Sequence, residues 1–166
     1  MPMTDALLPE FDHEMKTTRQ LIERVPADRL DWRPHPKSMA IGDLAMHICN
    51  LAQWSELVAT LPELDLNPGG TGFRPPALRP PPEMVKLFDQ NVAASRAAIA
   101  AIPDAAMMEP WTLSNNGAAI FTMPRVAVLR TFVMNHLIHH RGQLTVYLRL
   151  RDVPLPSVYG PTADQA

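Results

Sequence analysis

Asn135-His136-Leu137-Ile138-His139-His140-Arg141-Gly142-Gln143 is the most informative stretch of this chain, because it places three histidines inside one long apolar segment. Residues 126–150 have the apolar spacing of a helix that buries one face. Positions i and i+4 of a helix lie on the same face, so His136 and His140 project together. The predicted buried stripe consists of Val126, Leu129, Val133, His136, His140, Leu144 and Tyr147.

Two interpretations of this histidine pair are open. A single imidazole on a buried stripe is usually a core histidine held by hydrogen bonds. Two imidazoles are harder to bury, because each has two ring nitrogens that need partners. A divalent metal satisfies that need, and His-x-x-x-His is a good half-site for one.

A third histidine favours the metal. Residues 40–60 repeat apolar side chains with the period of a helix, and the repeat comprises Leu44, His47, Leu51, Trp54 and Val58. His47 therefore occupies a position where a core apolar residue is expected, and Trp54 is close enough along the helix to wall a pocket beside it. With one inward histidine on this helix and two on the last, a metal site becomes the preferred interpretation.

Length, charge and cysteine content restrict the remaining possibilities. The 166 residues suit one domain, residues 1–166, with a single core. A net charge of −2 gives no basic footprint for nucleic acid, and no apolar run approaches the ~20 residues of a membrane span. The single cysteine, Cys49, fits a reducing cytoplasm, so we expect a cytoplasmic protein. Cys49 lies about 200° round the helix from His47, which indicates a buried apolar role and not a metal ligand.

The other segments complete an all-α fold. A first helix is predicted from about Asp5 to Val25, and a third, alanine-rich helix from Glu83 to Ile102. Glycines and prolines between Pro62 and Pro82 indicate a loop, and the Asn116-Gly117 pair within residues 111–121 indicates a small hairpin. Four such helices predict a four-helix bundle, in which the long second connection lets the second and third helices run parallel. The expected inward residues are Leu7, Phe11, Met15, Thr18, Ile22 and Val25 on the first helix, and Val85, Phe88, Val92 and Ile99 on the third.

Several motifs together resemble the DinB/YfiT-like superfamily. They are Asp31-Trp32-Arg33-Pro34, Ser38-Met39, Leu44-Ala45-Met46-His47-Ile48 and the block from His136 to Leu144. The resemblance implies an up-down-down-up four-helix bundle, commonly a homodimer, with zinc or nickel bound by three histidines. By position these are His47, His136 and His140. One departure is Ala40, which stands where relatives often have a Ser or Thr that caps the helix.

Neighbouring polar residues receive separate interpretations. His139 lies on the next stripe of the helix, so we expect it to support the site or an interface without binding the metal. Asn135 and Gln143 are either partners that orient the imidazoles or solvated polar groups. Gly142 inside a helix indicates close packing against another backbone. Glu10-x-x-His13 matches a di-iron motif, but it occurs once and without an inward glutamate, so we reject a di-iron site.

Two classes of function follow. Three neutral imidazoles leave a tetrahedral metal with one open position, which suits a Lewis acid that activates water or a thiol. By family resemblance this predicts a thiol-dependent S-transferase, using a thiol such as bacillithiol, mycothiol or glutathione, or a hydrolase of small molecules. The alternative is a non-enzymatic stress-response protein whose metal is structural or sensory. The expected partner is a small molecule, with no nucleic acid and no membrane.

Overall fold

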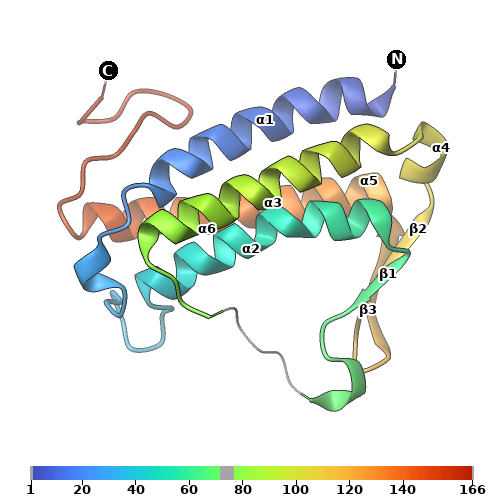
Figure 1. Ribbon diagram of the computed structural model, residues 1–166, viewed down its shortest axis with the longest axis horizontal. Coiled ribbons are helices and arrows are strands. Elements are labelled where there is room, and N and C mark those ends of the chain that lie inside the picture. The colour runs from blue at the N-terminus through green and yellow to red at the C-terminus, as the bar shows by residue number, and fades with distance from the viewer. Residues whose placement is uncertain (1, 72–76, 166) are drawn as a thin grey trace.

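The computed structural model describes residues 2–71 and 77–165 and is dominated by long helices (Figure 1). The three longest are α1 (Met3–Ile22), α2 (Ile41–Thr60) and α3 (Pro81–Ala101). The fourth long segment is continuous but changes its winding, from α5 (Arg125–Ala127) through a π-helical stretch (Val128–Asn135) to α6 (His136–Arg149). Within the described residues no helix is both long and apolar enough to cross a membrane.

The long helices surround one core. α1 packs against α3 and α6, and α2 packs against the same two helices from the other side. In Figure 1, α2 and α3 both run from left to right, whereas α1 and the α5–α6 segment run from right to left. Short elements lie between them, namely two 3-10 turns (Ala27–Arg29 and Pro68–Gly70) and α4 (Asp104–Met107).

A small sheet at one end of the helices contradicts the all-α expectation. Its strands, β1 (Glu63–Asp65), β2 (Pro110–Asn115) and β3 (Ala118–Pro124), lie in the order β1-β2-β3. β2 and β3 form the predicted hairpin, and Asn116 and Gly117 both have positive φ, 51° and 76°, as a two-residue hairpin turn requires. β1 pairs in parallel with β2 and lies inside the predicted loop 62–82, where three residues are too few to show a strand period. Residues 72–76 of that loop lie outside the described residues.

Asp65 ties β1 to the hairpin turn. Its carboxylate accepts hydrogen bonds from the backbone N–H groups of Asn67 (2.9 Å), Asn116 (2.9 Å) and Gly117 (2.8 Å). These bonds, that of Asn67 foremost, lower the pKa of Asp65. The segment after α2 is therefore held beside the hairpin, and both come to lie next to the end of α2.

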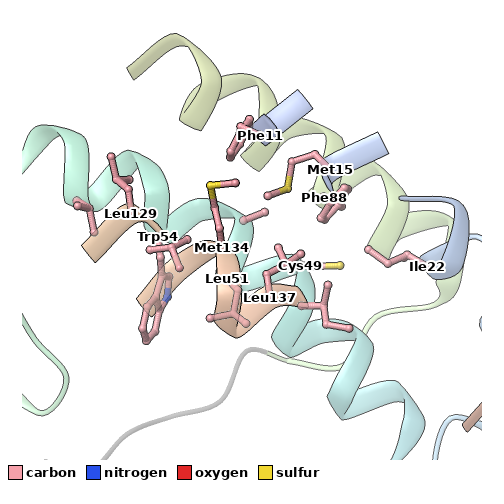
Figure 2. Packing of buried hydrophobic residues seen from close by; sticks show 14 of the residues in the cluster. Phe11, Met15, Ile22, Cys49, Leu51, Trp54, Phe88, Leu129, Met134 and Leu137 are labelled. Atoms are coloured by element: carbon pink, nitrogen blue, oxygen red, sulfur yellow. The ribbon is translucent and has the colours of Figure 1, made fainter. Parts of the chain in front are cut away.

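The predicted core is largely confirmed (Figure 2). All six residues predicted to face inward on the first helix, from Leu7 to Val25, are buried, although α1 ends at Ile22. On α3, Phe88 and Ile99 are buried, whereas Val85 and Val92 are only partly covered and pack at the edge of the core. The fully buried Met84 was missed, because a single methionine in an alanine-rich helix gives little periodic signal.

α2 begins without a side-chain cap. Ala40 stands at the N-cap, as the departure from the family pattern indicated, and the helix begins at Ile41. Backbone carbonyls replace the missing hydroxyl. The N–H of Ile41 donates to the carbonyl of Trp32 (2.8 Å), and the N–H of Gly42 donates to that of Leu30 (3.0 Å). The start of α2 is therefore fixed by the linker that precedes it.

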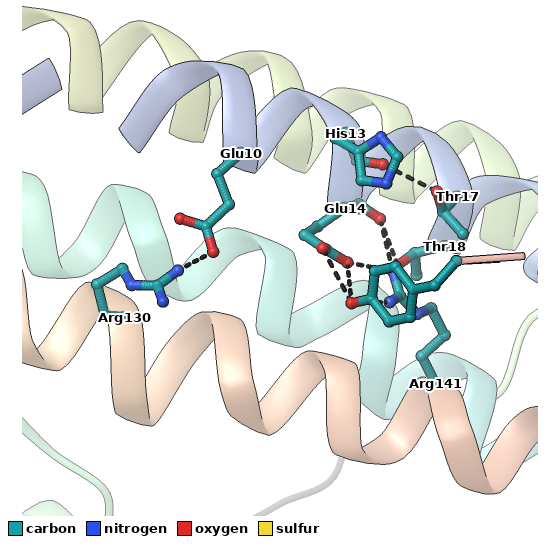
Figure 3. Close-up of polar contacts among 8 residues, drawn as sticks. Glu10, His13, Glu14, Thr17, Thr18, Arg130 and Arg141 are labelled. Atoms are coloured by element: carbon teal, nitrogen blue, oxygen red, sulfur yellow. Dashed lines mark hydrogen bonds and ion pairs between the residues drawn. The ribbon is translucent and has the colours of Figure 1, made fainter. Parts of the chain in front are cut away.

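A buried ion pair joins α1 to α6 (Figure 3). The side chains of Arg141 and Glu14 are 2% and 7% exposed, and Nη1 of Arg141 lies 2.5 Å from Oε2 of Glu14. Arg141 also donates to the hydroxyl of Tyr159 (2.7 Å), which in turn donates to the Glu14 carboxylate at 3.0 Å. Arg141 of the histidine block is therefore a structural residue that holds the C-terminal segment against the bundle.

Removing one partner of this pair leaves a buried charge without compensation. We expect Arg141→Ala to lower the free energy of unfolding by about 3–5 kcal/mol, and the double variant Glu14→Leu/Arg141→Met to recover much of that loss. Urea unfolding followed by circular dichroism measures both. An Arg141→Ala variant as stable as the parent would show that the pair does not hold the helices.

Two helical glycines have opposite environments. Gly142 is exposed, and nothing lies within 4 Å of the position that a Cβ would take, so the predicted close packing at Gly142 is wrong. At Gly42 a Cβ would lie 2.9 Å from the carbonyl oxygen of Leu30 and 2.8 Å from Cδ1 of Leu78. Gly42 is therefore the glycine that packing requires.

This contrast predicts opposite effects of one substitution. Gly142→Ala removes backbone freedom from the unfolded chain without a clash and should stabilise the protein by about 1 kcal/mol. Gly42→Ala should destabilise it, because the carbonyl of Leu30 cannot retreat without releasing the helix start. Thermal and urea unfolding of the two variants measure the difference, and a destabilised Gly142→Ala would contradict the open environment at this residue.

Candidate metal centre

Three histidines converge between α2 and α6. His47 lies on α2, and His136 and His140 lie one turn apart at the start of α6. One ligand atom of each residue lies within 4.8 Å of those of the other two, so the group could hold a metal ion. The ring centroids are 4.6 Å apart for His47 and His140, 5.3 Å for His47 and His136, and 4.8 Å for His136 and His140. The residues that the sequence predicted as ligands thus meet at one point.

The backbone before His136 is wound as a π-helix. Such turns are uncommon and often lie at functional sites. This stretch carries Phe132, whose ring lies 5.7 Å from that of His136 and stacks at 5.2 Å on that of Trp54 from α2. The π-helical winding therefore precedes the ligand pair directly and supplies an aromatic neighbour to it.

The hydrogen bond between His140 and Gln143 fixes which ring nitrogen is available. Nδ1 of His140 lies 2.7 Å from Oε1 of Gln143. An amide oxygen only accepts, so Nδ1 carries the proton and Nε2 keeps its lone pair for a metal. This hydrogen bond favours the interpretation of Gln143 as a partner that orients the His140 ring. Asn135 is exposed on the surface.

His136 adds a second sign of a ligand. Its Nδ1 is buried and has no hydrogen-bond partner among the described residues. Such an unpaired buried nitrogen is costly, and binding to an ion would account for it. The backbone carbonyl of Phe132 partly opposes the lowering of the pKa of His136. It does not meet the geometric criteria of a hydrogen bond to Nδ1. The donor set, three imidazoles without a carboxylate, fits zinc or nickel.

The surroundings favour the neutral form of all three rings. Burial, followed by the neighbouring His140 and His136, lowers the pKa of His47 from 6.5 to about 4. Burial is also the main cause that lowers the pKa of His136 and of His140, and Gln143 partly opposes it at His140. Neutral imidazoles are the form that binds a metal, so little proton competition is expected near neutral pH.

A cavity of about 260 Å³ opens beside the cluster and is lined by His47, Trp54, Leu66, Asn67 and Asn115. The prediction that Trp54 walls a pocket is confirmed. Leu66 and Asn67 follow β1, and Asn115 ends β2, so the small sheet supplies the opposite wall. These three residues were not predicted, because a pairing between β1 and β2 leaves no local signal in the sequence. The Asn116-Gly117 turn was the only hint of a wall there.

Other candidate residues lie apart from this centre. His139 is exposed and outside the histidine group, although its ring lies 5.0 Å from that of His140. Cys49 is buried, as predicted, and donates to the carbonyl of Met84 (3.5 Å), while burial raises the pKa of its thiol to about 12. Glu10 pairs with Arg130, and His13 stacks on Tyr159. Neither belongs to a group that could hold a metal in the described part of the chain.

Known structures share this fold. A DinB-like protein from Bacillus cereus superposes with a TM-score of 0.70 at 18% identity, covering 93% of this chain and 97% of that one. The DinB-like protein YjoA from Bacillus subtilis gives 0.70 at 19% identity, with 95% and 99% covered. A protein described as a DinB family member from Exiguobacterium sibiricum gives 0.66 at 20% identity, with 95% and 97% covered. Such low identities establish the fold alone.

Sequence comparison gives the family. No curated protein matches the chain. The sequence profile of the DinB family matches residues 1–166. The chain therefore belongs to the DinB family.

Proposed function

We propose that His47, His136 and His140 bind one divalent metal ion, zinc or nickel, and that the protein is a metal-dependent enzyme of small molecules. The proposed reaction classes are thiol-dependent S-transfer and hydrolysis. One observation carries this proposal. Three neutral imidazoles converge where one of them, His47, also borders an open cavity.

A metal at this centre would keep a place for a reactant. No fourth His, Cys, Asp or Glu joins the three histidines among the described residues, whereas closed structural sites more often have four protein ligands. When bound, the ion supplies a Lewis acid that lowers the pKa of a coordinated water or thiol.

The residues of the chain orient and shield this position. Gln143 holds the His140 ring through Nδ1 and leaves Nε2 available for the ion. Trp54 closes one side of the cavity and is braced by Phe132. The segment after β1 lines the cavity at Leu66 and Asn67 and does not fill it. A small molecule can therefore reach the ion from the side of the sheet.

A second candidate function is supported by the position of the ligands on two helices. An ion bound by His47 of α2 and His136 and His140 of α6 would cross-link neighbouring helices of the core. A protein in which the metal is structural or sensory, as in a stress response, would use that cross-link. Addition of small thiols to the cobalt-substituted protein separates the two functions, because only an accessible ion develops a sulfur–metal charge-transfer band.

Assembly and topology belong to the same proposal. We propose an up-down-down-up order for the four long helices and a homodimer, as the family resemblance implies. Val146 on α6 and Leu150 directly after its end are exposed apolar residues that a partner would cover. Light scattering at micromolar concentration tests the homodimer.

The triad predicts which single substitutions remove the metal. His47→Ala and His140→Ala each delete one of three ligands and should abolish tight binding. His139→Ala is the matched control and should retain it, because His139 lies outside the group. Metal content of the purified protein, produced without a histidine tag, measures the outcome. Loss of metal in His139→Ala with retention in His136→Ala would overturn this ligand set.

The lowered pKa values predict a pH dependence of the metal-free protein. His47 titrates at about 4 when folded but near 6.5 when unfolded. The unfolded chain therefore binds more protons between these values, and stability is present above pH 6.5 and lost as pH falls towards 4. For the same reason the metal should be retained somewhat below the pH of about 6 that unperturbed imidazoles would give.

Urea unfolding at about pH 7 and at about pH 5 tests this dependence. The lower pH lies between the pKa values of His47 in the folded and the unfolded chain. The parent protein should lose more stability on acidification than a His47→Gln variant, which cannot be protonated at this position. His139→Gln, at an exposed histidine, serves as control and should behave like the parent. Equal losses in the parent and His47→Gln would contradict the assignment to His47.

A further inference from the structure

We propose that the cavity beside His47 selects an uncharged, flat and apolar group of the ligand whose donor atom binds the metal. This inference rests on the proposed function, because it places the donor atom at the histidine centre. It adds the chemical class of the group that occupies the adjoining space.

The described lining of the cavity carries no full charge. Besides His47, the described residues that line the cavity are Trp54, Leu66, Asn67 and Asn115, all of which have uncharged side chains. No Asp, Glu, Lys or Arg of the described residues lines it. Asp65 lies next in sequence to Leu66, but its carboxylate accepts hydrogen bonds from the backbone N–H groups of Asn67, Asn116 and Gly117. A charged group entering the cavity would lose water without gaining a counter-ion.

One wall of the cavity is the aromatic residue Trp54. The indole of Trp54 stacks on Phe132 with an interplanar angle of 30°, and Phe132 contacts Phe121 of β3 edge to face at 5.1 Å. Trp54 is only 9% exposed, so its plane is fixed by packing. Rigid aromatic faces favour flat apolar groups, which stack in an offset arrangement.

The cavity is also small. Its volume of about 260 Å³ lies below the range of ~300–1,000 Å³ that is typical of drug-sized ligands. It therefore suits one ring or a short apolar group. Asn115, which is exposed at the end of β2, places a carboxamide in the lining that can hydrogen-bond a neutral polar substituent.

Hydroxamic acids of similar acidity test the inference, because they bind a metal directly and differ only in the attached group. We titrate the zinc-loaded protein calorimetrically with acetohydroxamic, benzohydroxamic and 4-carboxybenzohydroxamic acid. Benzohydroxamic acid should bind about tenfold more tightly than acetohydroxamic acid, because its ring is taken out of water. The added carboxylate should cancel most of this gain.

Variants assign the preference to the cavity. Trp54→Leu should reduce the ratio between the affinities of the benzo and aceto compounds to about twofold. Trp32→Leu is the matched control, since Trp32 packs on Tyr147 and does not line the cavity, and it should keep the ratio. Asn115→Asp, at an exposed position, should weaken the carboxylated compound about threefold further and favour a 4-aminomethyl analogue.

The possible outcomes separate this inference from the proposed function. Equal binding of the aceto and benzo compounds would overturn the inference and leave the metal centre intact. A benzo-to-aceto ratio unchanged by Trp54→Leu would also overturn it, and so would an affinity for the carboxylated compound unchanged by Asn115→Asp. If no hydroxamic acid binds and the protein takes up no zinc, the metal proposal fails, and the inference fails with it. The expected ratios, sensitive to Trp54 and insensitive to Trp32, support it.

Discussion

Placing three half-buried imidazoles between two neighbouring helices is the constraint that shapes this molecule. Each ring has two nitrogens, and the interior around them offers few partners. Gln143 satisfies one nitrogen of His140, whereas Nδ1 of His136 is buried without a partner in the described chain. An apolar stripe without histidines would pack more simply, so the arrangement is costly unless it serves a ligand. The aromatic brace, the cavity and the adjoining sheet all surround this one point.

The helices could be predicted from sequence because each carries a long stripe of buried residues. On α1 every predicted inward residue is buried, and on α2 and α6 the histidines occupy positions of the same apolar period. The sheet was only partly readable. The Asn116-Gly117 turn is a local signal that the sequence displays, whereas the pairing of β1 with β2 joins residues far apart in the chain. Tertiary pairing of this kind leaves no periodicity in three residues.

The site shows the same division between local and distant information. His47, His136 and His140 were predictable because helix geometry relates them to the core face. The residues and the backbone winding that surround these histidines were not predictable. Leu66 and Asn115 reach the cavity only after the sheet has formed, and the π-helical winding before His136 has no sequence signature. The close packing predicted at Gly142 was wrong, and the structural role of Arg141 was not predicted. A buried Arg141 needs Glu14 from a distant helix, and Gly142 is in fact exposed.

The start of α2 has a consequence for how this chain can vary. Because backbone carbonyls of Leu30 and Trp32, and not a hydroxyl, receive the first N–H groups of the helix, the contact does not depend on which side chains those two residues carry. It depends instead on the number of residues between Leu30 and Ile41. Point substitutions along this linker leave the capping groups in place, whereas an insertion or deletion would displace the helix start. Length, more than composition, is thus the property that this segment must keep, since His47 lies fewer than two turns beyond that start.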